Sequence, residues 1–194
     1  MGNNRQLGFS LIEVLISIFV LALGVIGAAG MQLVAARTSQ QSALQSVAVQ
    51  LATEMADKMR SNGKQMNQDD SANPFIFEHD SAADDAPTEP GKFCYGSAGC
   101  SDAEVAEFDI YNWTMQLRQA LPGGKVKICR DASPWSTADS RLQWDCSYTA
   151  STGNNAPFVI KVGWQGKNPD GTLIRDADKK FPPAVAITVE PYVK

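Results

Sequence analysis

Histidine is almost absent from this 194-residue chain, whose only histidine is His79. A serine or cysteine nucleophile is usually activated by a histidine base, and no serine here has a histidine partner at a recognisable spacing. A glycine-rich phosphate loop is also missing. We therefore predict a protein that is not an enzyme and that carries no cofactor. His79 lies in an acidic, loop-like stretch, so we expect it to be exposed to solvent.

Metal-ligand motifs and basic clusters are also missing from the sequence. The four cysteines include no CxxC pair, and a lone histidine cannot complete the usual zinc-ligand spacings. The aspartates of residues 64–100 lack the spacing of an EF-hand loop. Basic side chains do not gather into the footprint of a nucleic-acid-binding protein. We predict neither a bound metal nor a nucleic-acid partner.

Charge is nearly absent from residues 1–36, which contain only Arg5 and Glu13. The other 36 of the 38 charged residues (17 basic plus 21 acidic) lie in the 158 residues that follow. A helix rises about 1.5 Å per residue, so about 20 apolar residues cross a hydrocarbon core of roughly 30 Å. The uncharged run from Val14 to Met31, within an apolar stretch from Phe9 to Ala36, therefore predicts one membrane-spanning helix.

The apolar run is too long for a secretory signal peptide, whose apolar region has about 7–15 residues and a small-residue cleavage site behind it. The small residue in a cleavable position is Gly8, which precedes the run. Cleavage after Gly8 would remove a polar leader and leave the membrane helix on the mature chain. The basic residue of that leader, Arg5, favours a cytoplasmic N-terminus.

Glu13 lies inside the apolar stretch, where a carboxylate costs about 2.5–3.5 kcal/mol on insertion scales. One interpretation is that the helix dipole and headgroup water lower this cost, since Glu13 falls in the first helical turn. The other is that Glu13 pairs with a positive group when helices pack together. The amine that cleavage would free on Phe9 is such a group, on the same chain or on a neighbouring one.

The stretch Gly8-Phe9-Ser10-Leu11-Ile12-Glu13-Val14-Leu15 resembles the class III signal of type IV prepilins. This resemblance implies that a prepilin peptidase of the inner membrane cuts between Gly8 and Phe9 and methylates the new amine of Phe9. It also implies that Glu13 neutralises the amine of a neighbouring subunit during filament assembly. The protein would cross the inner membrane once, with its C-terminal head in the periplasm, before it enters the pilus (fimbrium).

Helical periodicity continues beyond the membrane segment. No proline or glycine occurs from Gln32 to Arg60, and apolar residues there recur at helical spacing. We predict one helix from Phe9 to Ser61. Residues 64–100 are rich in proline, glycine and aspartate and are predicted to be mainly loop, attached to the head by residues 75–77. A capping-box pattern at Ser101 and Glu104 begins a second helix that ends near Leu121.

Apolar residues alternate with polar ones in the last third of the chain, which predicts β-strands. The alternating positions are Val126 and Ile128, Leu142 and Trp144, Phe158 to Trp164, and Val185 to Val189. We predict an α+β fold in which the long helix packs against an antiparallel sheet of about four strands. The expected organisation is a leader (1–8), a transmembrane and assembly half of the helix (9–36) and a head (37–194). Within the head we expect the outer half of the helix (37–62), a loop with the second helix (63–124) and the sheet (125–194).

The four cysteines all lie in the predicted periplasmic head, where disulfides form. They allow three disulfide connectivities. We favour the local pairing, Cys94 with Cys100 and Cys129 with Cys146. Each of these bridges would hold a loop that has no core of its own, and each is worth very roughly 2–3 kcal/mol in the chain-entropy model.

The rest of the chain is similar to the PilV-type minor pilins of type IV pili. The similar stretches are Gly30-Met31-Gln32-Leu33, Ala56-Asp57-Lys58-Met59-Arg60-Ser61-Asn62, Trp113 before Leu121-Pro122-Gly123-Gly124, and Val162-Gly163-Trp164. This resemblance implies a priming complex at the pilus tip with other minor pilins, the major pilin and an adhesin, in support of adhesion and twitching motility. Two alternatives remain at this point: a minor pseudopilin of a type II secretion system, and a membrane-anchored periplasmic binding module.

Overall fold

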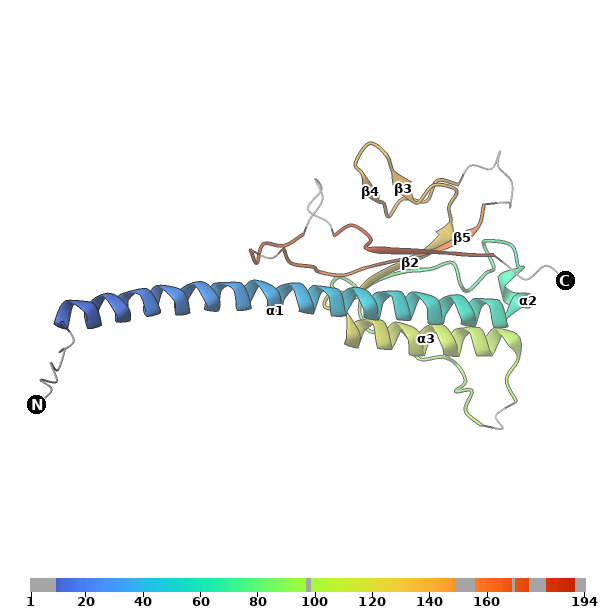
Figure 1. Ribbon diagram of the computed structural model, residues 1–194. Helices are drawn as coiled ribbons and strands as arrows, with labels where there is room; N and C mark the ends of the chain where they lie inside the picture. Colours follow the sequence, from blue (N-terminus) through green and yellow to red (C-terminus); the bar gives the residue numbers. More distant parts are fainter. Residues whose placement is uncertain (1–9, 97–98, 149–155, 169, 175–180, 191–194) are drawn as a thin grey trace, which may run out of the picture. The chain divides into compact units, whose positions relative to one another are not determined.

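The computed structural model describes residues 10–96, 99–148, 156–168, 170–174 and 181–190. The elements follow one another as α1 (Leu11–Ser61), α2 (Gly63–Met66), β1 (Glu78–Asp80), α3 (Asp102–Ala120), β2 (Lys125–Arg130), β3 (Trp135–Ser136), β4 (Arg141–Leu142), β5 (Phe158–Gly163) and β6 (Val185–Val189) (Figure 1). The expected leader and Phe9 lie outside the described residues. Helices and an antiparallel sheet together confirm the predicted α+β fold.

The helix α1 is continuous over 51 residues, as predicted, and it includes Gly24, Gly27 and Gly30 in its first half. The chain divides into two compact units, residues 1–40 and residues 41–194, so the division falls inside this helix. All of the α1 side chains that are fully buried belong to the second unit: Ala48, Leu51, Ala52, Met55, Ala56 and Met59. The predicted apolar stripe of the outer helix is therefore confirmed.

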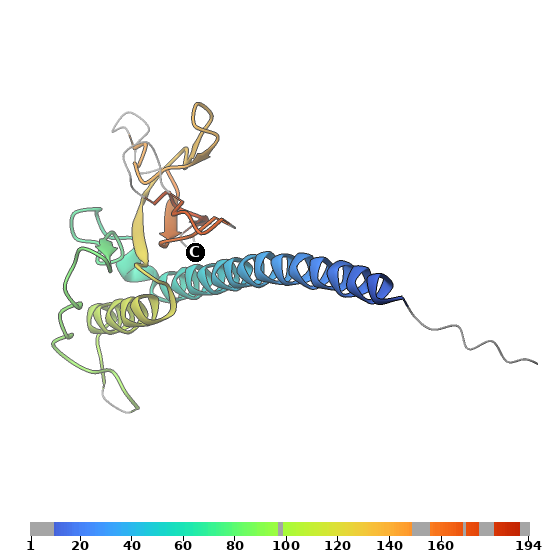
Figure 2. The same cartoon turned by 90° about the vertical axis from the view of Figure 1, so that its left-hand side faces the viewer.

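The helix α3 runs beside the outer half of α1 in both views (Figure 1 and Figure 2). It begins with the predicted capping box: the Ser101 hydroxyl accepts a hydrogen bond from the Glu104 amide, and the Glu104 carboxylate accepts one from the Ser101 amide at 2.7 Å. Two contacts join the helices. The indole Nε1 of Trp113 donates to the Leu51 carbonyl at 2.8 Å, and Lys58 forms an ion pair with Asp109 at 2.8 Å.

The main sheet has the strand order β1-β2-β5-β6, with every neighbouring pair antiparallel. The register sets Ile128 opposite Ile160 and Ile160 opposite Ile187. One face of the sheet closes the hydrophobic core with α1 and α3. Every residue of β5 is buried, because the segment 131–148 lies against the opposite face: Lys161 bonds to the Asp145 carbonyl there. This strand is the most enclosed element of the head.

One predicted strand is in a different place. Leu142 and Trp144 do not add a strand to the main sheet; β4 pairs only with β3 in a separate two-stranded sheet. The fourth strand of the main sheet is β1, in the stretch predicted to be loop. Its Glu78 forms ion pairs with Lys125 at 2.8 Å and Lys127 at 3.0 Å on β2. Acidic residues have low strand propensity on their own, so this strand depends on the lysines of its neighbour.

The prediction that His79 is exposed to solvent is wrong. His79 is the middle residue of β1, pairs in register with Val126 and is 8% exposed. Successive side chains of a strand point to opposite faces. The side chain of His79 is therefore buried, whereas those of its neighbours Glu78 and Asp80 lie on the outer face. Its Nε2 lies 3.1 Å from Nη1 of Arg118 on α3. Burial lowers the pKa of His79, and Arg118 lowers it further; together they outweigh the opposing effects of Asp84 and Asp80 and hold the pKa below its ordinary value.

Candidate functional site

The first 30 residues of α1, from Leu11 to Gln40, form an apolar surface that is exposed within the described structure. We call this surface the assembly segment. All of its side chains are exposed, and its most hydrophobic 18-residue window has a mean hydropathy of 2.6. The exposed large apolar residues are Leu11, Ile12, Val14, Leu15, Ile16, Ile18, Phe19, Val20, Leu21, Leu23, Val25, Ile26, Met31, Leu33 and Val34. An apolar surface of this extent is buried in lipid or against other chains.

Glu13 projects from the first turn of the assembly segment. Its amide donates to the Ser10 carbonyl at 3.0 Å, and its own carbonyl accepts from the Ser17 hydroxyl at 2.6 Å. No described residue forms an ion pair with the Glu13 carboxylate. The only other charged residue of the segment, Arg37, is 24 positions away, about 36 Å along a helix. Within the part of the chain that the structure describes, Glu13 therefore has no cationic partner.

The sequence-predicted processing residues, Gly8 and Phe9, lie outside the described residues. Ser10 is the first residue that the structure describes, and α1 begins at the next residue, Leu11. Any amine produced at Phe9 would lie about one helical turn from Glu13 along the sequence.

The described residues thus comprise a long helix whose first part is apolar and exposed, with Glu13 as its only carboxylate, and a unit that contains further helices and an antiparallel sheet. Residues 3–29 match the family model described as the prokaryotic N-terminal methylation motif. Residues 30–111 match the model described as type IV pilin Tt1218, so the two matches together cover residues 3–111, more than half of the chain. No curated protein and no solved structure matches the chain significantly.

The chain belongs to the type IV pilins. This is a family of structural proteins and not of enzymes. Its members are anchored in a membrane by the apolar helix, processed by prepilin peptidase and assembled with other pilins into a filament. The assembly segment, which contains most of the matched methylation motif, is therefore the candidate functional site.

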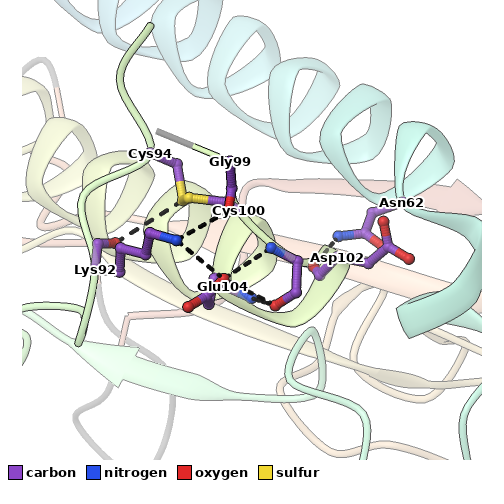
Figure 3. Close-up of a disulfide and its surroundings, with 8 residues drawn as sticks. Asn62, Lys92, Cys94, Gly99, Cys100, Asp102 and Glu104 are labelled. Carbon is purple, nitrogen blue, oxygen red and sulfur yellow. Dashed lines mark hydrogen bonds and ion pairs between the residues drawn. A yellow bond between two sulfur atoms is a disulfide. The ribbon is translucent and has the colours of Figure 1, made fainter. Parts of the chain in front are cut away.

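A disulfide fixes the loop in front of α3. Cys94 is bonded to Cys100, and Figure 3 shows the polar contacts around this bridge. The ammonium of Lys92 donates to the Gly99 carbonyl at 2.9 Å and lies 3.7 Å from the Glu104 carboxylate. Next to it, the side-chain amide of Asn62 donates to the Asp102 carbonyl at 2.6 Å, which links the end of α1 to the start of α3. The loop is thus held at both ends.

Removing this bridge is expected to weaken the head without unfolding it. The double substitution Cys94→Ser/Cys100→Ser opens a loop of about seven residues, for which the chain-entropy model gives a loss of about 2 kcal/mol. Urea unfolding of the detergent-solubilised full-length chain measures this difference. The matched control is Cys129→Ser/Cys146→Ser, which opens a longer loop and is expected to cost about 3 kcal/mol. Equal stability of all three proteins would contradict the role given to the bridges.

The second disulfide, Cys129 to Cys146, lies next to a buried ion pair that sequence reasoning missed. The ammonium of Lys161 on β5 and the carboxylate of Asp131 are 2.5 Å apart, and both side chains are fully buried. The Asp131 carboxylate also accepts hydrogen bonds from the Ser133 amide and the Ser147 hydroxyl. A lysine inside the apolar run Val-Ile-Lys-Val-Gly was the available signal, because an unpaired buried charge is not tolerated.

The pKa of Asp131 is set by opposing effects. Burial alone would raise the pKa, but the hydrogen bonds from Lys161, Ser147 and Ser133 outweigh it and hold the pKa below its ordinary value. The Asp131 carboxylate therefore stays ionised at neutral pH. The ion pair of Asp131 and Lys161 links the segment 131–148 to β5. This segment therefore covers the face of the sheet that does not contact the helices.

Proposed function

We propose that this protein is a minor pilin of the PilV type, incorporated at low copy into a type IV pilus. In this proposal prepilin peptidase cleaves between Gly8 and Phe9, methylates the amine of Phe9 and leaves Glu13 at the fifth position of the mature chain. The observation that carries the proposal is the assembly segment. It is an apolar helix surface of 30 residues with one carboxylate, Glu13, and one cation, Arg37, which is about 36 Å away from Glu13 along a helix.

Assembly through Glu13 follows from the cost of its charge. A carboxylate in the hydrocarbon region costs about 2.5–3.5 kcal/mol, and a free amine at Phe9 adds a comparable cost. When one subunit's carboxylate meets another's amine, both costs are reduced together. The apolar residues around Glu13 keep this pair in a region of low dielectric, where an ion pair is strongest. The same charges therefore select for packing in register with a neighbour.

The proposed organisation divides the chain into a leader (1–8), a transmembrane and assembly half (9–36) and a periplasmic head (37–194). Two disulfides in the head suit an oxidising compartment such as the periplasm. The partners we propose are the other minor pilins, the major pilin and a tip adhesin. In a priming complex of these proteins the head would support pilus assembly, adhesion and twitching motility.

Deletion of the gene with complementation tests this function. We expect the deletion strain to have few surface pili and little twitching, and the wild-type gene to restore both. Secretion of exoproteins should be unchanged in the same strain. Normal piliation, adhesion and twitching would contradict the proposal, and a secretion defect with normal pili would assign the protein to a type II secretion system instead.

A further inference from the structure

A cavity of about 220 Å³ lies at the end of the main sheet, where β1 ends and β2 begins. Its walls include three aromatic side chains, Trp144, Trp164 and Phe181, and three polar ones, Asp80, Lys125 and Gln165. All of these residues belong to the unit 41–194 and none belongs to the assembly segment. The cavity is therefore a feature of the head that filament assembly through α1 does not explain.

Two glycines let the walls approach the backbone closely. A Cβ on Gly163 would lie 2.9 Å from Cζ2 of Trp144, and a Cβ on Gly123 would lie 2.7 Å from the Gln165 side chain. A larger residue at either position would move these side chains. The Trp144 ring is held in addition by a hydrogen bond from its Nε1 to the Phe181 carbonyl. The aromatic wall is thus fixed in place by the fold.

Polar groups beside the cavity lack partners. Trp164 is only 4% exposed, and its indole Nε1 has no hydrogen-bond partner among the described residues. The hydroxyl of Ser81 has no such partner either, but Ser81 is not one of the residues that line the cavity. Buried polar groups normally find a partner. An oxygen atom of a guest in the cavity would supply the acceptor that the Trp164 indole lacks.

The charges at the cavity are already balanced within the protein. The ammonium of Lys125 is 2.8 Å from Glu78 and 3.7 Å from Asp80, and it lies 5.1 Å from the centre of the Trp144 ring. No unpaired lysine or carboxylate is left to bind an ion. The groups that remain for recognition are the aromatic side chains, the Gln165 amide and the free lone pairs of the Asp80 carboxylate. These groups suit an uncharged guest with hydroxyl groups.

We propose that this cavity binds one neutral pyranose ring of a saccharide. A flat aromatic wall packs against the C–H face of such a ring, while its hydroxyl groups exchange hydrogen bonds with Gln165, Asp80 and the indole of Trp164. The volume is below the range of about 300–1,000 Å³ typical of drug-sized ligands, so it admits one ring and not a chain. This inference stands independently of the proposed pilus function.

Saturation-transfer NMR on the full-length protein tests the proposal, in a detergent without a sugar headgroup. The probes are the methyl pyranosides of glucose, galactose and mannose, each compared with its free sugar. We expect saturation transfer from at least one of them at millimolar concentration. Preference for the methyl pyranoside indicates the end of a longer glycan, and preference for the free sugar indicates a soluble monosaccharide.

Two variants locate the binding. Ala82→Trp places a ring at the exposed edge of the cavity, and Gln165→Glu replaces the amide by a carboxylate of the same shape; each is expected to lower the affinity at least about tenfold. The control is Trp135→Ala, which removes an exposed tryptophan of β3 outside the cavity and should change nothing. The proposal is overturned if no neutral probe shows transfer, if glucose 6-phosphate alone does, or if both cavity variants bind like the wild type.

Discussion

Glu13→Gln is expected to leave the chain processed and membrane-bound but to reduce its incorporation into pili about a hundredfold. The substitution keeps the shape of the side chain and removes the charge that would pair with a neighbouring amine. An unpaired charge in the hydrocarbon region costs about 2.5–3.5 kcal/mol, which corresponds to roughly two orders of magnitude in an equilibrium constant. Quantitative immunoblots of sheared pili and of membranes measure the ratio.

The matched control is Glu13→Asp, which keeps the charge on a shorter side chain and should retain most of the incorporation. A second control, Arg37→Gln, removes the other charge of the assembly segment, about 36 Å away along a helix. It should incorporate normally, because that distance excludes it from the Glu13 pair. If Glu13→Gln enters pili as well as the wild type, assembly does not depend on this carboxylate, and the helix is only an anchor.

Asp131→Asn is expected to destabilise the head by about 3–5 kcal/mol, because it leaves the Lys161 ammonium buried without a counter-charge. Urea unfolding of the full-length chain in detergent measures the loss. The double variant Asp131→Asn/Lys161→Met removes both charges and should recover most of the stability, since a buried pair often contributes little net free energy. A double variant no more stable than the single one would mean that Asp131 acts mainly through Ser133 and Ser147.

The same pair predicts a pH dependence with a definite sign. The folded-state pKa of Asp131 lies below its unfolded value of about 3.9. Its contribution to stability is therefore complete above that value and is lost as the pH falls through the lower folded pKa. The difference in free energy of unfolding between wild type and Asp131→Asn should be constant near neutrality and should shrink below about pH 4. A difference that grows on acidification would contradict this assignment.

Much of the fold could be predicted because its signals are local. The absence of proline and glycine from Gln32 to Arg60, and the capping box of Ser101 and Glu104, specify helices from neighbouring residues alone. The alternation in β2, β5 and β6 was equally readable. The strand β1 was not, because its residues gain strand structure only from the lysines of β2, which are more than 40 positions away in the sequence. The interior position of His79 follows from that same missed pairing.

The candidate site divides in the same way. Glu13 is recognisable from the sequence because a charged residue within a long apolar run has a high free energy of membrane insertion. The local disulfide pairing, which the structure also has, follows from short loops. Lys161 and Asp131 are 30 positions apart, and their pairing needs the segment 131–148 to fold over the sheet. The aromatic cavity gathers residues from five separate stretches, so nothing in any one stretch indicates it.

The most direct test of the central claim is mass spectrometry of the N-terminal peptide in pili sheared from cells. Our account predicts that this protein is present in the filament fraction and that its first peptide begins at Phe9 with one methyl group on the amine. A chain found only in membranes, with the leader from Met1 still attached, would contradict assembly through the processed N-terminus.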